Sequence, residues 1–270
     1  MDVPTFMSLF DKELEINRQL HSYYRLGSDR KRYWFRKAYF EQRLQYVADH
    51  TTGTGLHIWD AGCGYGTSSI FLALNGHRVY GNTLEYYSDV FRDRLEYWGQ
   101  HGDLESLEMK HENVFHHAPP GRTYDVILVQ DTLHHLEPVH EALVLFYRLL
   151  RSGGKLIVVE ENGSSLFIRA KNLRIRGFKR KGICHDARTG ESIPFGIENA
   201  MGMKAWFILL ESAGFNCESP DLEFIRLFPP FLIRQDNYQR ILQLERKIGR
   251  NYRVIRKFFY FGMNFTVTRP

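Results

Sequence analysis

A glycine-rich turn that directly follows a short apolar run constrains the fold of this chain more than any other feature. The stretch WDAGCGYGTSS, residues 59–69, carries Gly62, Gly64 and Gly66 at GxGxG spacing, with Asp60 just before them. A buried strand that turns through glycines into a helix forms the nucleotide-binding crevice of a doubly wound α/β sheet. Glycine lets the backbone approach a ligand, and the helix N-terminus offers unpaired N–H groups to it. The stretch therefore predicts a nucleotide-like cofactor.

Apolar runs and amphipathic segments alternate from Leu56 onward, which is typical of a doubly wound sheet. The apolar runs are short and nearly continuous, so they predict parallel strands covered by helices on both faces. After them comes a charged amphipathic segment, residues 236–259, and a run of strand composition, residues 261–268. The earlier strands are expected at residues 56–62, 78–85, 107–115, 124–132, 155–162 and 217–228.

Composition and charge bear on where the protein is located and on what it could bind. No apolar run is long enough to cross a bilayer. Three scattered cysteines, and an N-terminal stretch without an apolar core, predict a cytoplasmic location rather than secretion. Residues 169–181 and 246–257 are strongly basic within a net charge of +5. Such runs suit an anionic membrane surface or nucleic acid, although a solvated face is the commoner meaning of either run alone.

The order of these motifs resembles that of class I S-adenosylmethionine-dependent methyltransferases. A dinucleotide motif needs a third glycine where this chain has Thr67, whereas GxGxG after an acid suits S-adenosylmethionine. The resemblance is close over residues 56–162 and loose beyond. It implies a Rossmann-like doubly wound sheet, mostly parallel, with an antiparallel last strand, an N-terminal helical cap and a helix inserted before the last strand. The implied division is a cap at residues 1–52, a methyltransferase domain at 53–270, and acceptor-side elaborations at 163–200 and 229–258.

The resemblance also implies which residues hold the cofactor, S-adenosylmethionine. Asp60 would lie near the methionine end, while Asn113 would meet the adenine amino group beside Val114. Gln130 and Asp131, which end the fourth strand, would line the edge where the methyl group is transferred. The full set comprises Asp60, Gly62, Cys63, Gly64, Gly66, Thr83, Leu84, Glu85, Asn113, Val114, Gln130 and Asp131.

The end of the second strand departs from the commonest pattern of the family. Many members have an acid there that accepts hydrogen bonds from both ribose hydroxyls, and this chain has Thr83. Because a carboxylate is the better acceptor for two hydroxyls, we assign the contact to Glu85 with Thr83 assisting. The alternative is that Glu85 only caps the helix that begins at Tyr86, where the helix dipole favours an acid.

Candidate catalytic groups follow the fourth and fifth strands. Methyl transfer from a sulfonium requires alignment of the nucleophile and, for a poor nucleophile, removal of a proton. His134 and His135 suit hydroxyl methylation because the imidazole pKa lies near neutrality, and Glu160 is a further candidate base. At least one of the two histidines is expected to serve packing instead.

The N-terminal helices supply candidate contacts to the acceptor. Tyr23, Tyr24, Tyr33 and Trp34 would form a lid over it, or else would pack ordinarily on the core. The stretch Cys184-His185-Asp186 is interpreted as a loop, because a zinc site needs about four ligands and no second ligand pair is evident. No metal is expected.

These observations predict a methyltransferase that acts on a small or lipid-like acceptor, at oxygen. The alternative is carbon methylation of an isoprenoid or aromatic ring, with Glu160 removing the proton. Less favoured is a nucleic-acid-binding protein or RNA methyltransferase, since QDTL at residues 130–133 lacks the Asn/Asp-Pro-Pro-aromatic tetrad typical of base N-methylation. A binding protein that keeps the fold without catalysis is a further alternative. Peripheral contact with an anionic membrane fits the basic runs, and the sequence leaves the oligomeric state open.

Overall fold

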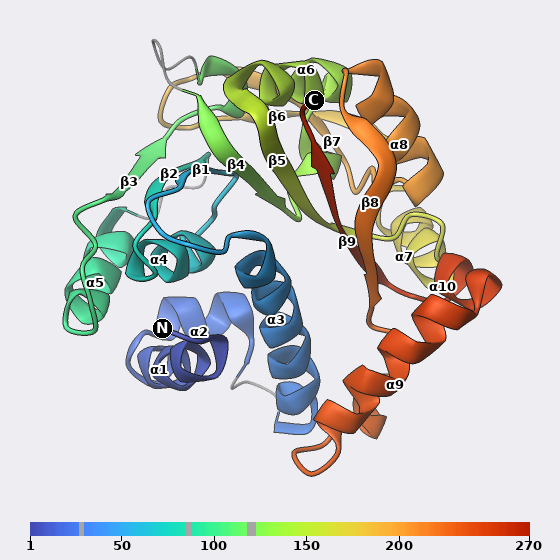
Figure 1. The fold of residues 1–270 in the computed structure, drawn as a ribbon, viewed down its shortest axis with the longest axis horizontal. Coiled ribbons are helices and arrows are strands. Elements are labelled where there is room, and N and C mark those ends of the chain that lie inside the picture. Colours follow the sequence, from blue (N-terminus) through green and yellow to red (C-terminus); the bar gives the residue numbers. More distant parts are fainter. Residues whose placement is uncertain (27–29, 85–87, 118–122) are drawn as a thin grey trace.

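A seven-stranded sheet forms the centre of the molecule (Figure 1). The computed structural model describes residues 1–26, 30–84, 88–117 and 123–270. The strands lie in the order β3-β2-β1-β4-β5-β9-β8. Strand β9 pairs antiparallel with both β5 and β8, and the other neighbouring pairs are parallel. Their bounds are β1 His57–Ala61, β2 Arg78–Thr83, β3 Leu107–His111, β4 Tyr124–Gln130, β5 Leu150–Glu161, β8 Asn216–Ile225 and β9 Gly262–Thr268. The predicted Rossmann-like sheet with an antiparallel last strand is confirmed.

Helices cover both faces of this sheet because successive strand residues point to opposite sides. On one face, Ile58, Leu128 and Ile157 pack in a core with the N-terminal helices and with α4 and α5. On the other face, Trp59, Ile127 and Val158 pack against α6 and α8. The helices are α1 Val3–Ile16, α2 Arg18–Tyr24, α3 Arg30–His50, α4 Thr67–Leu74, α5 Ser88–Gly99, α6 Val139–Leu149 and α8 Met203–Ser212.

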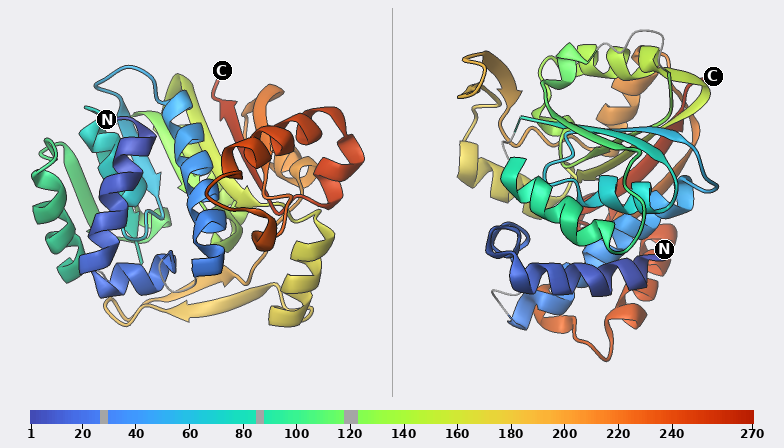
Figure 2. Two further views of the ribbon diagram at one scale, coloured as in Figure 1. Left: turned by 90° about the horizontal axis from the view of Figure 1, so that it is seen from below. Right: turned by 90° about the vertical axis from the view of Figure 1, so that its left-hand side faces the viewer.

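The N-terminal helices are part of the main core. On α1, Phe6 and Phe10 are fully buried, and Phe6 stacks on Trp98 of α5 with ring centroids 4.4 Å apart. Helix α3 contacts β5 and β9, so it crosses the sheet near its middle (Figure 2). Residues 1–52 therefore extend across one face of the sheet, with α1 packed on α5 beside the glycine-turn half and α3 packed over β5 and β9.

Two segments differ from the sequence-based expectation. The basic segment before residue 200 holds a helix, α7 (Leu166–Arg176), and a separate hairpin of β6 (Lys181–His185) and β7 (Ser192–Gly196). Cys184 and His185 therefore end a strand, and their interpretation as a loop is wrong. The expected helix over residues 236–259 is broken into α9 (Tyr238–Asn251) and α10 (Arg253–Phe258).

Short 3-10 turns follow the ends of three strands and carry part of the site. They are η1 Val114–His116, η2 Leu133–His135 and η3 Pro230–Leu232. Among the described residues, no helix combines the length and the apolar composition that a bilayer crossing requires.

Candidate active site

A cavity of about 820 Å³ lies at the carboxyl edge of the parallel strands. Its walls come from the segments that follow β1 to β4, from α2 and α3, and from β7 of the separate hairpin. This edge is where doubly wound sheets bind their ligands, and the volume falls in the range of small-molecule sites.

The glycine turn forms one wall of the cavity with its backbone. Gly62 and Gly64 have φ values of +80° and +53°, which favour glycine. A Cβ on Gly62 would lie 2.4 Å from the side chain of Thr132, so no larger residue fits without movement. The amides of Gly62 and Cys63 both donate to the carbonyl of Asn82, at 3.0 and 2.9 Å. The turn is thereby fixed to β2, and its backbone borders the space that a ligand would occupy.

The N-terminus of α4 borders the same wall. Thr67 and Ser68, its first two residues, line the cavity. Gly66 is the N-cap with φ of +74° and provides no side-chain cap, so the first-turn amides lack that partner. Ser68 Oγ accepts a hydrogen bond from Gln130 Nε2 at 2.6 Å, which joins this turn to the end of β4. The unpaired backbone N–H groups of this first turn suit a ligand group that carries negative charge.

Asp60 lies behind the turn and does not line the cavity. It is 1% exposed, and its Oδ2 accepts a hydrogen bond from Ser69 Oγ at 2.6 Å. Its Oδ1 is buried without a hydrogen-bond partner among the described residues. Burial raises the pKa of Asp60 to about 6. The expected contact of Asp60 with the methionine end therefore stays a prediction, as does any contact of Gly66, which also lies outside the lining.

The ends of β2 and β3 bring the expected adenosine residues to the cavity. Thr83, Leu84, Asn113 and Val114 all line it. Asn113 Oδ1 accepts from the amide of Phe115 at 3.1 Å, which fixes the orientation of the side chain. Glu85 lies outside the described residues, so its assignment to the ribose stays a prediction.

Glu112 also lines the cavity, and sequence reasoning did not single it out. Its Oε2 accepts a hydrogen bond from Tyr80 Oη at 2.7 Å and lies 3.0 Å from His117 Nδ1. Asn113 was predicted because it follows the third strand. Glu112 follows the same strand and could have been predicted by the same reasoning.

Two of the four aromatic residues expected in the lid reach the cavity. Tyr23 and Tyr24 line it, and the Tyr24 hydroxyl lies 2.6 Å from Thr67 Oγ1 at the start of α4. Tyr33 instead donates to Asp11 Oδ2 at 2.8 Å. Trp34 stacks on Tyr238 of α9 with centroids 5.5 Å apart. Neither Tyr33 nor Trp34 lines the cavity, so the geometry supports ordinary packing for these two.

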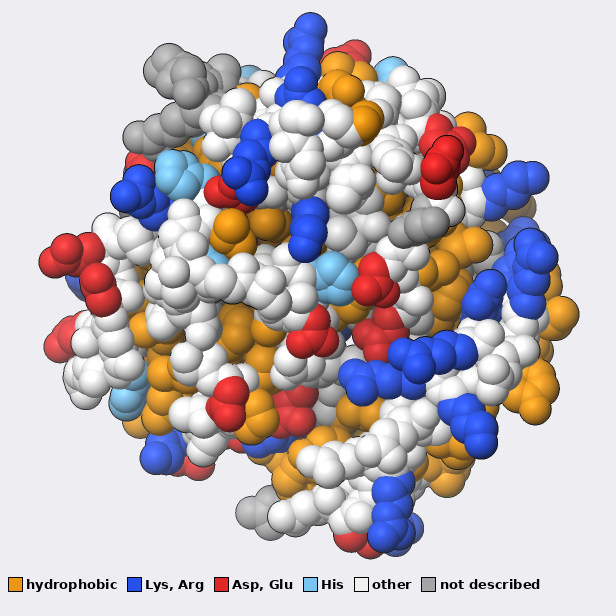
Figure 3. Space-filling view, in the orientation of Figure 1, with side chains coloured by type: hydrophobic (Ala, Val, Ile, Leu, Met, Phe, Trp, Pro, Cys, Tyr) orange, Lys and Arg blue, Asp and Glu red, His pale blue; other side chains and the backbone are white. Residues whose placement is uncertain are grey.

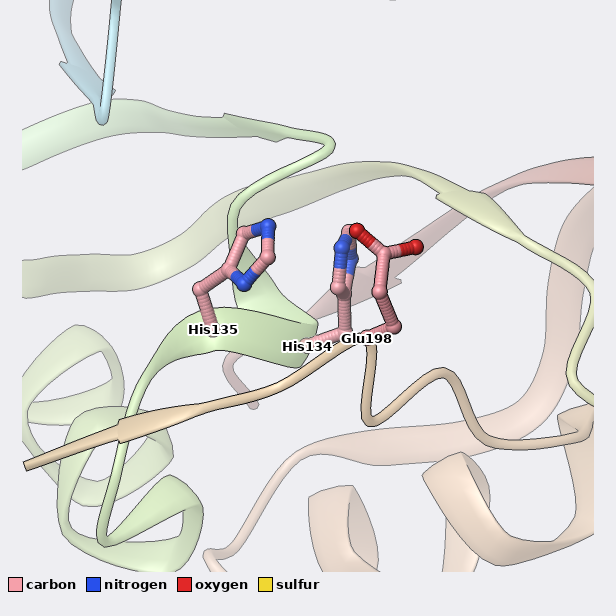
Figure 4. A group of neighbouring side chains, drawn as sticks. All are labelled: His134, His135 and Glu198. Carbon is pink, nitrogen blue, oxygen red and sulfur yellow. The ribbon is translucent and has the colours of Figure 1, made fainter. Parts of the chain in front are cut away.

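The two histidines after β4 occupy different environments (Figure 4). His134 is 5% exposed, and its Nδ1 lies 2.5 Å from Glu160 Oε2. Desolvation opposes its protonation, but the charge and the hydrogen bond of Glu160 raise the pKa of His134 to about 9. At neutral pH His134 is thus an imidazolium paired with Glu160, and neither residue lines the cavity.

His135 lines the cavity, and its ring orientation is fixed by the hairpin. Its Nδ1 lies 2.8 Å from the carbonyl oxygen of Gly196. A carbonyl only accepts, so Nδ1 carries the hydrogen, and in the neutral imidazole Nε2 carries the free electron pair. His135 therefore has the tautomer that a general base at the cavity requires.

His134, His135 and Glu198 also form a group whose candidate metal-ligand atoms lie within 4.8 Å of one another. Figure 4 shows their side chains converging. Two of the three already have charged partners, because His134 pairs with Glu160 and Glu198 Oε2 lies 3.1 Å from Lys171 Nζ. These ion pairs explain why the three side chains lie close together without a metal ion.

Among the described residues, four arginines line the cavity and were missed by sequence reasoning: Arg25, Arg36, Arg43 and Arg226. Arg43 of α3 and Arg226, which follows β8, both line it. Arg43 Nη2 lies 2.5 Å from Oδ2 of Asp131. Desolvation would raise the pKa of Asp131, but the charges of Arg43 and Arg226 lower it below its ordinary value. Arg226 could have been found by the rule that selected Asp131, since it follows the carboxyl end of a strand; Arg43 carries no such signal.

Comparisons with known proteins agree with this geometry. Residues 59–158 match the family model described as a methyltransferase domain. The S-adenosyl-L-methionine-dependent Diels-Alderase iccD of Talaromyces variabilis is 27% identical over 201 residues. That match covers 71% of this chain and 66% of that protein, so the chain spans just under two thirds of its relative.

Solved structures share the fold at lower identity. The (4+2)-cyclase SpnF has a TM-score of 0.54 and 17% identity, covering 85% of this chain and 80% of that one. Magnesium protoporphyrin IX methyltransferase from Synechocystis PCC 6803 has a TM-score of 0.53 and 16% identity, covering 87% and 84%. At identities this low, the solved structures establish the fold of the chain. Its reaction has to be inferred from the residues of the cavity.

Proposed function

We propose that this chain, whose residues 59–158 match the family model described as a methyltransferase domain, is an S-adenosylmethionine-dependent methyltransferase that transfers a methyl group to an oxygen of a small or lipid-like acceptor. The observation that carries the proposal is His135. It lines the cavity, and its Nδ1–H is held by the Gly196 carbonyl, which leaves Nε2 to accept a proton. A hydroxyl is a poor nucleophile until its proton is removed, so a positioned base favours oxygen as the site of methylation.

The residues divide the cavity into two halves. Gly62, Gly64 and Asn113 border the donor half, where S-adenosylmethionine would supply a methyl group already activated on sulfonium. Aromatic and apolar side chains border the other half, including Tyr39 of α3 and Phe195 of β7. These side chains exclude water from the acceptor and hold it in line with the donor, which is what an in-line displacement requires.

The expected alternative of carbon methylation assisted by Glu160 has less support. Glu160 is 2% exposed, is paired with His134 and does not line the cavity. The proposal therefore assigns Glu160 to fixing His134, and His134 to supporting the turn that carries His135.

A second candidate function is favoured by the relatives. Both the Diels-Alderase iccD and the cyclase SpnF catalyse ring formation according to their names, and one of them is S-adenosylmethionine-dependent. A chain of this type would bind S-adenosylmethionine to shape the cavity without consuming it. Release of S-adenosylhomocysteine in step with acceptor conversion separates the two candidates.

Contact with an anionic membrane belongs to the same proposal. On α7, Leu166, Phe167, Leu173 and Ile175 are each at least half exposed, and Phe178 is 93% exposed just beyond it. Basic residues of the same segment lie among them, and Figure 3 shows basic and hydrophobic side chains side by side on the flank over α7 and α10. Apolar side chains flanked by arginine and lysine suit the interface of an anionic bilayer. A cytoplasmic location is likewise part of the proposal.

The experiment that tests the main proposal has two stages. Calorimetric titration of the full chain should detect binding of both S-adenosylmethionine and S-adenosylhomocysteine, and its absence for both would overturn the proposal. Methyl-labelled S-adenosylmethionine is then incubated with a panel of phenols, alcohols and carboxylic acids. Label that appears only in carbon-methylated products would assign the reaction to carbon instead.

A further inference from the structure

One nitrogen of the Arg226 side chain, at the wall of the cavity, lacks a hydrogen-bond partner in the part of the chain that the structure describes. Arg226 follows β8 and has a φ of +63°, an uncommon conformation for a residue other than glycine. Its carbonyl accepts from the amide of Phe261 at 3.0 Å, which holds the backbone in place. Its Nε is buried without a hydrogen-bond partner among the described residues. An unmatched buried donor destabilises the folded protein, so the unpaired Nε calls for a ligand that satisfies it.

The charges around Arg226 leave the end of the cavity with one excess positive charge. Burial and the nearby charge of Arg43 lower the pKa of Arg226, while Asp131 and Glu161 oppose that effect. Both acids are engaged elsewhere, since Asp131 pairs with Arg43 and Glu161 Oε1 lies 2.6 Å from Lys171 Nζ. Among the described charged residues that line the cavity, Arg43 and Asp131 are the two that act on Arg226, so two guanidinium groups stand with one carboxylate at this end. Arg25, Arg36 and Glu112 line the cavity as well.

The position of Arg226 assigns this charge to the acceptor rather than to the methyl donor. The donor half is built on the turn after β1, and three strands, β4, β5 and β9, lie between β1 and β8. At about 4.8 Å per strand, this places the ends of β1 and β8 roughly 19 Å apart along the sheet edge. Under the proposed function the methionine end of the donor would lie at the turn after β1, so Arg226 is assigned to the other occupant of the cavity.

We propose that the acceptor is an apolar carboxylic acid whose carboxylate is bound by Arg226, with Arg43 beside it. This inference rests on the proposed function. The planar guanidinium fork matches the two oxygens of a carboxylate and binds them through two parallel hydrogen bonds. A monoanion neutralises the excess positive charge that Arg43, Arg226 and Asp131 leave at this end of the cavity. Phe35 and Tyr39, which pack edge to face at 4.9 Å and line the same cavity, supply an apolar wall for the body of the acid.

The test compares matched acids and amides on protein saturated with S-adenosylhomocysteine. The probe pairs are benzoate and benzamide, 3-phenylpropanoate and its amide, and octanoate and its amide, each titrated calorimetrically. At least one acid should bind wild-type protein about tenfold more tightly than its amide, which is about 1.4 kcal/mol. Arg226→Gln should abolish that preference and leave the affinity for S-adenosylhomocysteine unchanged. The exposed Arg234, on the same connection after β8, provides the control Arg234→Gln, which should retain the preference.

Arg226→Lys keeps the charge without the fork, and it should retain part of the preference even if Arg226→Gln folds poorly. The proposal is overturned if no acid is preferred over its amide by wild-type protein, or if the preference survives in Arg226→Gln. It is also overturned if Arg226→Gln weakens S-adenosylhomocysteine instead, because Arg226 would then bind the donor. Failure of wild-type protein to bind S-adenosylhomocysteine at all is a different result, and it refutes the proposed function itself.

Discussion

Glu13 of α1 and Arg94 of α5 form a two-pronged ion pair from which water is excluded. Arg94 Nε and Nη2 donate to the two carboxylate oxygens of Glu13 at 2.8 and 2.9 Å, and both side chains are at most 2% exposed. The remaining nitrogen, Nη1, donates to the carbonyl of Tyr65 at 2.6 Å and to Thr67 Oγ1 at 2.8 Å. A single guanidinium therefore joins the first helix to the glycine turn.

Replacing Glu13 should destabilise the protein strongly. Glu13→Gln leaves the buried charge of Arg94 uncompensated, and breaking a buried pair in this way costs about 3–5 kcal/mol. Urea denaturation followed by circular dichroism measures the free energy of unfolding. Glu15→Gln, an exposed change on the same helix, should alter it by less than about 0.5 kcal/mol. Equal stabilities for the two variants would show that the pair contributes nothing to the fold.

Replacing His135 should slow catalysis without loosening the cofactor. His135→Gln removes the base that the Gly196 carbonyl orients, and a positioned general base contributes about 10²–10⁴-fold to rate. With an acceptor found in the labelling screen, kcat should fall by at least about 10²-fold while the affinity for S-adenosylhomocysteine is unchanged. His140→Gln, an exposed change on α6, serves as the control. An undiminished kcat in His135→Gln would remove the histidine base from the mechanism.

The His134–Glu160 pair should make the protein less stable as the solution becomes alkaline. The pKa of His134 rises from 6.5 to about 9 on folding. The folded state therefore holds the proton more tightly, and this stabilisation is complete below about pH 6.5 and is lost as pH rises through 9. The shift corresponds to at most about 3 kcal/mol. Unfolding free energies measured from pH 6 to 10 should decline in wild-type protein.

Glu160→Gln removes the carboxylate that holds the proton, so its stability should depend less on pH over the same range. Glu141→Gln, an exposed change, should leave the wild-type slope in place. Parallel slopes for wild-type protein and Glu160→Gln would contradict the assignment of the titration to this pair.

The glycine turn should tolerate no side chain at Gly62. In Gly62→Ala the new Cβ meets Thr132 at 2.4 Å in addition to the cost of a φ of +80°. Gly190→Ala isolates the backbone cost, because Gly190 has a φ of +72° and open space around it. Gly190→Ala should lower the unfolding free energy by about 1 kcal/mol. Gly62→Ala should lower it further by about 1–3 kcal/mol and weaken S-adenosylhomocysteine binding. If the two variants lose equal stability, the close approach of Thr132 is relieved at no cost.

The cavity residues that follow the parallel strands could be predicted to lie together because their positions follow from local sequence. Gly62, Gly64 and Asn113 each follow a strand whose apolar run is plain, and parallel strands bring their carboxyl ends to one edge. The same reasoning placed Gln130 and Asp131 correctly at the cavity. It depends only on the order of strands along the chain.

Other cavity residues are brought there by contacts between distant segments, which no local pattern encodes. Arg43 reaches the cavity because α3 crosses the sheet, and Phe195 reaches it because a hairpin folds back over the end of β4. Tyr33 and Trp34 were expected at the cavity on composition, but helical geometry turns them toward Asp11 and Tyr238. The hairpin at residues 181–196 was not predicted because its strands are short and mostly exposed. Their sequences therefore lack the apolar run that marks a buried strand.

The hairpin of β6 and β7 forms a sheet of its own, joined to the β4 edge by the bridge between Leu136 and Phe195 and by the contact of His135 with Gly196. It contributes acceptor-side wall to the cavity but no part of the glycine turn. Under the proposed function, selection on residues 181–196 would change which acceptor is bound and would leave the glycine turn unaltered. If the hairpin were exchanged between related chains, the proposed function predicts that the preferred acceptor would change with it. The exchanged hairpin would have to keep a glycine at position 196 whose carbonyl contacts His135.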